Sequence, residues 1–350
     1  MTKKRLTLAV LAAMLVGIGT QASANTLEKV SVLQPIPNYD VRYAPWAIAQ
    51  EEGYFAQEGL EVDLPLAKGS MVAIQQLVNG KGQYAQLPPD GVIIANSKGA
   101  DLKFYYSFIT KNPFPLAVEE NSPIKSLADI KGKKIGVYSL SAVQFYTSQA
   151  IMKSVGLEKD KDYQMIDVGS GASALAALQR GDVDVLAHDI LIYSGFHNRG
   201  ANLRFMSSPQ IDKVFSWGLV TTGDNLNKNP AQATALARAL TKGRIACAAD
   251  TQRCIEAYFK RYPTAKPMGM DSATAVKEQE EILKQYIAYG PKPADGQWGS
   301  YAPDAWAAAM NYMLDAGLIS APVDASKMYT AALLPQINAF DAGALVKPAP

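Results

Sequence analysis

The first part of the chain alternates between strand-like and helix-like patterns of apolar residues. Strand patterns occur at residues 30–36, 60–66 and 102–109, and patterns with one apolar helical face occur at residues 45–55 and 70–79. Gly53 and Gly59 allow turns that end the first of these helices before the next strand begins. Strands that alternate with helices indicate βαβ units, and therefore a mostly parallel sheet covered by helices.

A second alternating run begins after Phe114 and Pro115. Its strand patterns lie at residues 116–120, 133–139, 163–168 and 184–189, and its helix patterns lie at 127–130, 142–155 and 173–179. Beyond residue 222 the pattern changes to helices at 231–249, 254–262, 273–289 and 303–316. We therefore expect an α/β chain with two sheets and a helical C-terminal part.

This order predicts that the chain crosses between two lobes twice, near residues 114–118 and again near 218–222. Residues 25–115 and 220–350 then form lobe one, and residues 116–219 form lobe two. Two crossings make a hinge, and a cleft between hinged lobes can close around a ligand. Two independent domains in series would also produce this pattern.

Residues 1–24 have the features of a secretory signal peptide. Three basic residues (3–5) precede an apolar stretch at 6–19, and small residues end the segment. We expect cleavage after Ala24, so that the mature chain begins at Asn25 without a cysteine for a lipid anchor. An uncleaved membrane anchor is the alternative, although the apolar stretch is short for a membrane span.

The charge of the mature chain is nearly balanced. The leader carries three basic and no acidic residues, which leaves 31 basic and 32 acidic side chains. This balance lacks the basic surface of a protein that binds nucleic acid. The remaining 326 residues are enough for two lobes, at roughly 100–200 residues per domain.

The chain has two cysteines, Cys247 and Cys254. On one unbroken helix they would lie about 10 Å apart by helix rise alone, which is too far for a disulfide. The residues between them can instead form a corner, with Asp250 or Thr251 capping a second helix. A disulfide, two free buried thiols and, less readily, a metal site remain open, since neither histidine is near in sequence.

Four segments carry a resemblance to a known family. They are AxxEGYFxxEGLEV within residues 43–62, AKGSMVAIQQLVNGKG at 67–82, SPIKSLADIKGKKIGV at 122–137 and ALAALQRGDVDVL at 174–186. In this order they resemble the periplasmic solute-binding proteins of ABC importers for nitrate, for taurine and other sulfonates, and for the pyrimidine precursor of thiamine.

The resemblance implies a type II-like periplasmic binding protein that captures a small nutrient between two closing lobes. It would act as a monomer, without cofactor, metal or catalytic residues, and deliver its ligand to the permease and ATPase of an ABC importer. The alternatives are a sulfonate, carboxylate or oxyanion binder of the same family and a sensory binding protein for a membrane receptor. Enzymes that make the thiamine pyrimidine also resemble this family, but their cysteine-rich motif does not occur here.

One segment departs from the family pattern. Members often carry aspartate in a motif of the form sGkaDfg, whereas this chain reads NGKGQYAQLPPD with Ala85 at that position. We expect a shortened, proline-braced loop and a rebuilt ligand wall there. The ligand of any one relative therefore does not transfer to this chain.

Ligand groups in such a protein come from the carboxyl ends of strands and the N-termini of the helices that follow. This rule, with aromatic residues at the same ends, selects the following candidates: Gln34, Asn38, Tyr39, Tyr43, Lys68, Gly69, Ser70, Pro89, Asp90, Phe114, Tyr138, Ser139, Ser141, His188, Asp189, Tyr193 and Trp217.

Several candidates also have ordinary structural explanations. Ser139, Ser141 and Ser70 could hold an anion or polar atom at a helix N-terminus, or could be simple helix caps. His188 and Asp189 could form a pH-sensitive hydrogen-bonding pair in the cleft, or a satisfied pair in the core. The glycine-rich run at 169–173 lacks the ending of a phosphate-binding loop.

Aromatic residues at the cleft-facing ends favour a ring-bearing ligand. Flat side chains such as Tyr39 and Tyr43 can stack on a planar molecule, whereas Trp46 within its helix is more typical of the core. Arg42 and Lys68 could instead serve an anion. We therefore expect a pyrimidine or similar heterocycle first, a sulfonate or carboxylate second and a simple oxyanion last.

Overall fold

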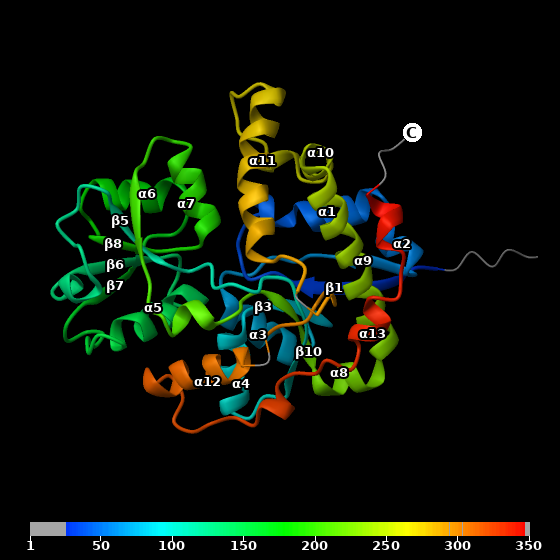
Figure 1. Cartoon of the computed structure of the whole chain (residues 1–350), viewed down its shortest axis with the longest axis horizontal. Coiled ribbons are helices and arrows are strands. Elements are labelled where there is room, and N and C mark those ends of the chain that lie inside the picture. The colour runs from blue at the N-terminus through cyan, green and yellow to red at the C-terminus, as the bar shows by residue number, and fades with distance from the viewer. Residues whose placement is uncertain (1–25, 294, 303, 347–350) are drawn as a thin grey trace, which may run out of the picture.

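A computed structural model describes residues 26–293, 295–302 and 304–346. The expected signal peptide at residues 1–24 lies outside these residues. Figure 1 shows two bodies, with the second sheet and helices α5 to α7 on the left and the first sheet with most helices on the right. We call the body around the first sheet lobe one and the body around the second sheet lobe two.

The first sheet has the strand order β2-β1-β3-β10-β4. Its strands are β1 (Glu28–Leu33), β2 (Leu60–Asp63), β3 (Tyr84–Leu87), β4 (Leu102–Ser107) and β10 (Gly218–Thr222). Strand β1 is parallel to β2 and β3, whereas β10 is antiparallel to both β3 and β4. The last strand to join therefore inserts between two strands formed earlier in the chain.

The second sheet repeats this arrangement with the order β7-β6-β8-β5-β9. Its strands are β5 (Leu116–Glu119), β6 (Lys134–Val137), β7 (Gln164–Asp167), β8 (Val185–Ala187) and β9 (Leu203–Met206). Strands β7, β6 and β8 are parallel, and β5 is antiparallel to β8 and β9. The prediction of a mostly parallel sheet in each lobe is confirmed, with one antiparallel strand in each.

Short helices follow most strands. Lobe one has η1 (Val41–Tyr43), α1 (Ala44–Glu51), α2 (Tyr54–Gln57), α3 (Ser70–Val78) and α4 (Pro89–Ser97), and lobe two has η2 (Leu127–Ile130), α5 (Val143–Lys153), α6 (Ala172–Gln179), α7 (Ile190–His197) and η3 (Ile211–Lys213). Pro45 lies in the first turn of α1, where its missing N–H is not needed. Gly53 has φ 72° between α1 and α2, which favours glycine there.

The elements β3, α4, α7 and β9 were not predicted from the apolar pattern. All four residues of β3 are buried, so the strand lacks the alternation that marks a half-exposed strand. Helix α4 starts within the segment expected to be a proline-braced loop, because Pro89 occupies its first turn. Strand β9 is an edge strand of four residues with an exposed Phe205.

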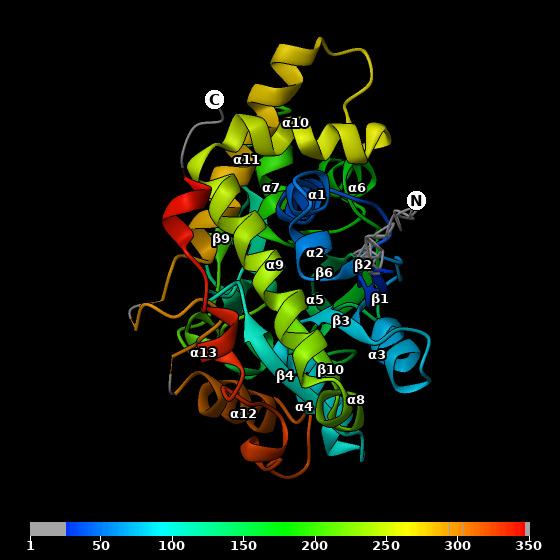
Figure 2. The ribbon, with the colours of Figure 1, turned by 90° about the vertical axis from the view of Figure 1, so that its right-hand side faces the viewer.

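The C-terminal part is helical, as expected. It comprises α8 (Gly223–Lys228), α9 (Pro230–Ala249), α10 (Thr251–Arg261), η4 (Pro263–Ala265), α11 (Ser272–Tyr289), α12 (Ala305–Asp315), η5 (Ala325–Lys327), α13 (Leu334–Ile337) and η6 (Ala342–Leu345). Figure 2 shows α9 running along lobe one, where it packs against α1. In Figure 1, α11 stands beside α7 and α12 lies below α5. Within the described ranges, no helix is both long and apolar enough to span a bilayer.

The two cysteines form a disulfide at a corner between α9 and α10. The Cα atoms of Cys247 and Cys254 lie 5.0 Å apart. The Asp250 side chain accepts a hydrogen bond from the Arg253 amide and caps α10, which is one of the two caps that the sequence allows. This corner brings together two cysteines that a single helix would separate.

The two segments that cross between the lobes are hydrogen-bonded to each other. The amides of Phe108 and Ile109 donate to the Trp217 carbonyl at 3.0 and 3.1 Å, and the Ser216 amide donates to the Ile109 carbonyl at 2.9 Å. Strand β10 pairs with the first sheet from Gly218 onward. The crossings thus form a two-stranded hinge, and the exact domain boundaries stay a prediction.

Candidate functional site

A small chamber lies between the two lobes, at the carboxyl ends of strands from both sheets. We call it the inner chamber, and its volume is about 30 Å³. It is lined by Ile36, Pro37, Asn38, Asp40, Arg42, Tyr138, Gln144, Ser170, His188, Asp189 and Ile192. These residues follow β1, β6, β7 and β8, which is where an α/β fold places ligand groups.

Arg42 links the two lobes at this chamber. Its Nε atom donates to both carboxylate oxygens of Asp40, at 2.8 and 3.1 Å, and its Nη1 atom donates to Asp189 Oδ2 at 3.1 Å. The guanidinium lies 5.8 Å from the centre of the Trp217 ring. Burial alone would lower the pKa of Arg42, but Asp189 and Asp40 hold this pKa well above its usual value. The arginine therefore stays charged, and two carboxylates share its charge.

Two side chains of lobe two that line the chamber carry buried polar atoms without a protein partner. His188 Nε2 and the Tyr138 hydroxyl are buried and have no hydrogen-bond partner among the described residues. Burial lowers the pKa of His188 to about 4, so the imidazole is neutral at pH 7. Burial, with the nearby Asp167, raises the pKa of Tyr138 to about 12. Buried polar atoms normally have partners, so these two atoms mark a place for a ligand or water.

A larger outer chamber opens from the inner one. Its volume is about 670 Å³, and it shares Pro37, Asn38, Asp40 and Ile192 with the inner chamber. Its other walls come from α7 and the residues after it in lobe two, and from the loop after β1, α10 with the segment after it, and α11 in lobe one. They include Tyr39, Arg199, Tyr258, Lys266 and Met268. The two chambers together form one cleft between the lobes.

The chambers bring together five of the residues predicted from the sequence. Asn38, Tyr138, His188 and Asp189 line the inner chamber, and Tyr39 joins Asn38 in the outer one. One face of the Tyr39 ring stacks on Tyr262, with ring centres 4.1 Å apart.

Four other predicted residues meet one another across the lobes. The Ser141 hydroxyl donates to the Lys68 carbonyl at 2.8 Å and lies 3.0 Å from the Ser139 hydroxyl. The Ser141 carbonyl accepts a hydrogen bond from the Met71 amide at 3.2 Å, and Gly69 lies directly against Ser141. Lobe two therefore covers the N-terminus of α3, and these residues lie outside the linings of both chambers.

The remaining predicted residues are buried and line neither chamber. They are Gln34, Tyr43, Ser70, Pro89, Asp90, Phe114, Tyr193 and Trp217. The Tyr193 hydroxyl, for example, accepts from the His188 amide at 2.7 Å and so fixes the loop that carries the imidazole. Asp90 accepts from the Thr147 hydroxyl of lobe two at 3.0 Å.

The polar lining residues Asp40, Gln144 and Ser170 were not among the predicted set, and Arg42 was named only as a possible partner for an anion. Asp40 caps η1 and lies in the same loop as Asn38, and Ser170 follows β7. The rule of strand ends points to these loops, but it does not tell which side chain turns inward. Gln144 lies in the first turn of α5 and carried no signal of its own.

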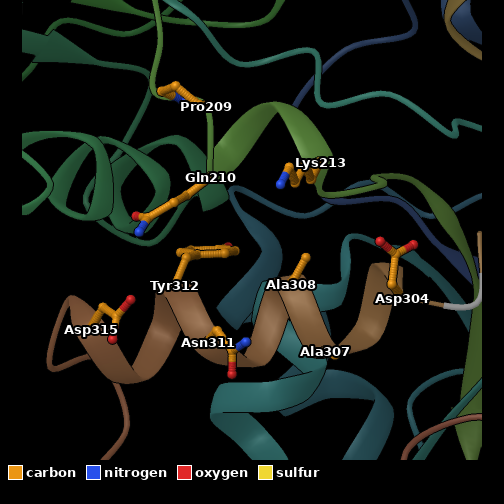
Figure 3. A pocket seen from close by; sticks show the side chains of 9 residues that line it. All are labelled: Pro209, Gln210, Lys213, Asp304, Ala307, Ala308, Asn311, Tyr312 and Asp315. Atoms are coloured by element: carbon orange, nitrogen blue, oxygen red, sulfur yellow. The ribbon is translucent and has the colours of Figure 1, made fainter.

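A second crevice lies between η3 and α12, away from the strand ends (Figure 3). Its volume is about 400 Å³. Gln210 and Lys213 lie on one side, and Asn311 and Tyr312 of α12 lie on the other. Because its walls come from η3 and α12 and not from the ends of strands, we place the candidate site in the cleft instead.

Two known proteins are similar in sequence to this chain, one over most of its length and one over a little less than half. The riboflavin-binding protein RibY of Chloroflexus aurantiacus is 23% identical over 317 residues, which cover 89% of this chain and 87% of that protein. A putative thiamine biosynthesis protein of Haemophilus influenzae is 29% identical over 165 residues, 45% of this chain and 49% of that protein.

A solved structure confirms the fold. The periplasmic aliphatic sulphonate binding protein SsuA of Escherichia coli matches with a TM-score of 0.63 and 18% identity, over 86% of this chain and 96% of that chain. The fold is thus that of periplasmic binding proteins. The family model described as NMT1/THI5 like matches residues 41–253, which is more than half of the chain. This chain belongs to the NMT1/THI5-like family.

Proposed function

We propose that this protein is the solute-binding component of an ABC import system and captures a small nutrient between its two lobes. RibY and SsuA are named as riboflavin-binding and aliphatic sulphonate-binding proteins, and this supports a binding role for the fold. Capture needs no chemical step, since the closed lobes enclose the ligand and present a new surface to a permease. The expected signal peptide would direct the protein to the periplasm. We propose that it acts there as a monomer.

The observation that carries this proposal is the pair of unsatisfied polar atoms on two side chains that line the inner chamber. His188 Nε2 and the Tyr138 hydroxyl are buried at the junction of the lobes. Leaving such atoms unpaired costs about 1–3 kcal/mol each. A ligand that supplies the missing hydrogen bonds recovers this free energy only when the lobes close, which couples binding to closure.

The charge of the inner chamber favours a neutral or donor-rich ligand over an anion. Among the described lining residues, Arg42 is the one cation of the chamber, and it forms ion pairs with both Asp40 and Asp189. An anion about 4 Å from the second carboxylate would be repelled by about 4 kcal/mol at an effective dielectric constant near 20. We therefore place a pyrimidine, flavin or similar heterocycle before a sulfonate, carboxylate or nitrate.

Identification of the natural ligand tests the proposal. The protein is first purified without denaturant, so that a bound ligand stays in place. It is then unfolded, and the released small molecules are identified by mass spectrometry. Candidates are then returned to ligand-free protein, and the melting temperature and the radius of gyration are measured. We expect a heterocycle that raises the melting temperature and compacts the protein. If no small molecule does either, or if the bound molecule is chemically converted, the capture model is wrong.

A further inference from the structure

We infer that the ligand is a two-ended molecule, with N–H donors on a ring edge at the inner chamber and an acidic group in the outer chamber. This inference rests on the proposed function, because it concerns the ligand of the same cleft. It follows from the opposite charges of the two chambers and from their sizes.

The inner chamber has a net negative charge. Its charged lining residues are Arg42, Asp40 and Asp189, and neutral His188 adds no charge. The carboxylates and the unpaired atoms of His188 and Tyr138 can accept hydrogen bonds. This surface is complementary to N–H groups, such as those of an aminopyrimidine or of a flavin imide.

The outer chamber has the opposite charge. Arg199 and Lys266 line it from different lobes, and neither forms an ion pair with any other residue in the described part of the chain. The chamber's acidic residue, Asp40, already accepts two hydrogen bonds from Arg42. Lys266 donates to the Ser272 hydroxyl at 2.6 Å, which holds the ammonium beside the chamber without neutralising it. An acidic group between the two cations would also join the lobes.

The sizes of the chambers set the orientation of the ligand. About 30 Å³ admits one or two groups the size of water, whereas about 670 Å³ admits a ring and its substituent. Only the edge of a ring therefore reaches the inner chamber. The body of the ring lies in the outer chamber beside Tyr39, whose other face is already stacked on Tyr262.

Two matched pairs of probes test this inference: riboflavin with riboflavin 5′-phosphate, and thiamine with thiamine monophosphate. The members of each pair share a ring with N–H donors and differ in the phosphate. Affinities are measured by calorimetry for the full mature chain and for the double variant Arg199→Gln/Lys266→Gln. Lys98→Gln, which removes an exposed cation away from the chambers, is the control.

We expect the phosphorylated member of a pair to bind roughly tenfold tighter, in line with two exposed ion pairs. High salt and the double variant should remove this difference, whereas Lys98→Gln should keep it. Equal binding of both members, or weaker binding of the phosphorylated one, would overturn the inference and leave the proposed function intact.

The ligand released from the purified protein decides the case in which neither pair binds. A ring compound with both N–H donors and an acidic group, whose affinity falls in the double variant, supports the inference. A released ligand without an acidic group overturns it while upholding capture. If nothing is released and nothing binds, the proposed function fails and the inference fails with it.

Discussion

Gly69 and Ser141 touch backbone to backbone across the cleft. A Cβ atom on Gly69 would lie 2.9 Å from the carbonyl carbon of Ser141, closer than real Cβ contacts. The Met71 amide, two residues on, donates to the carbonyl of the same serine. The lobes can therefore reach this closed arrangement only because position 69 has no side chain.

Gly69→Ala should hold the lobes apart. The backbone of Ser141 cannot give way as the end of a flexible side chain could, so the hinge must open to relieve the contact. We expect small-angle scattering to show a larger radius of gyration for this variant than for the wild type, with and without ligand.

Gly80→Ala is the matched control for this experiment. Gly80 also has positive φ, at 69°, but a Cβ there would meet nothing within 4 Å. Gly80→Ala should lose about 1–2 kcal/mol of stability through its left-handed backbone. Gly69→Ala should lose about 1–3 kcal/mol, because φ 107° and ψ 156° belong to a region that is essentially reserved for glycine. A radius of gyration that is the same for both variants would contradict the role of Gly69 in closure.

Arg42→Met should strongly destabilise the protein. It leaves Asp189 buried without its partner, and breaking a buried ion pair costs about 3–5 kcal/mol. Arg180→Met is the control, since Arg180 and Asp182 form an exposed pair worth at most about 1 kcal/mol. Urea unfolding measures both losses. Adding Asp189→Asn to Arg42→Met should restore part of the loss, and no restoration would contradict the pairing.

The fold could be predicted because each lobe repeats a local pattern. The stretch from Trp46 to Val62 already contains a buried helical face, a left-handed glycine and an alternating strand. Strand β3 escaped prediction because it is buried on both faces, so its pattern carries no period of two. Contacts with other parts of the fold bury both faces of β3, and a sequence of four residues does not reveal these contacts.

The candidate site could be predicted in part, for a similar reason. His188 and Asp189 follow a strand, and the rule of strand ends finds them without knowledge of the other lobe. Ser141 satisfies the same rule, yet lobe one covers it in the closed arrangement. Arg42 forms its ion pair with Asp189, which is 147 residues away in sequence. Such pairings arise only when the two lobes come together.

Thr147→Val should destabilise the closed lobes through Asp90. Burial raises the pKa of this carboxyl, and Thr147 donates one of its hydrogen bonds. Loss of the donor should cost about 1–3 kcal/mol in urea unfolding at pH 7.

Asp90→Asn is the companion change, because an amide has the same shape without the buried charge. Because the pKa of Asp90 is higher in the folded state than in the unfolded state, ionisation of this carboxyl lowers the stability of the protein as pH rises. Asp90→Asn removes the charge and should therefore preserve or increase stability at pH 7. Thr147→Val should then cost less in the Asp90→Asn background. An equal cost in both backgrounds would show that the two residues are not coupled.

His188→Gln should make the protein less sensitive to mild acid. The folded pKa of His188 is about 4, against about 6.5 in the unfolded chain, so the unfolded state binds the proton first. Stability is therefore fully present above pH 6.5 and falls by about 3 kcal/mol as pH approaches 4. The variant lacks this loss, which urea unfolding of ligand-free protein at pH 7 and pH 4.5 can measure. His197→Gln, at the chain's other histidine, should retain the wild-type loss. If both variants lose as much stability in acid as the wild type, His188 is not buried in its neutral form.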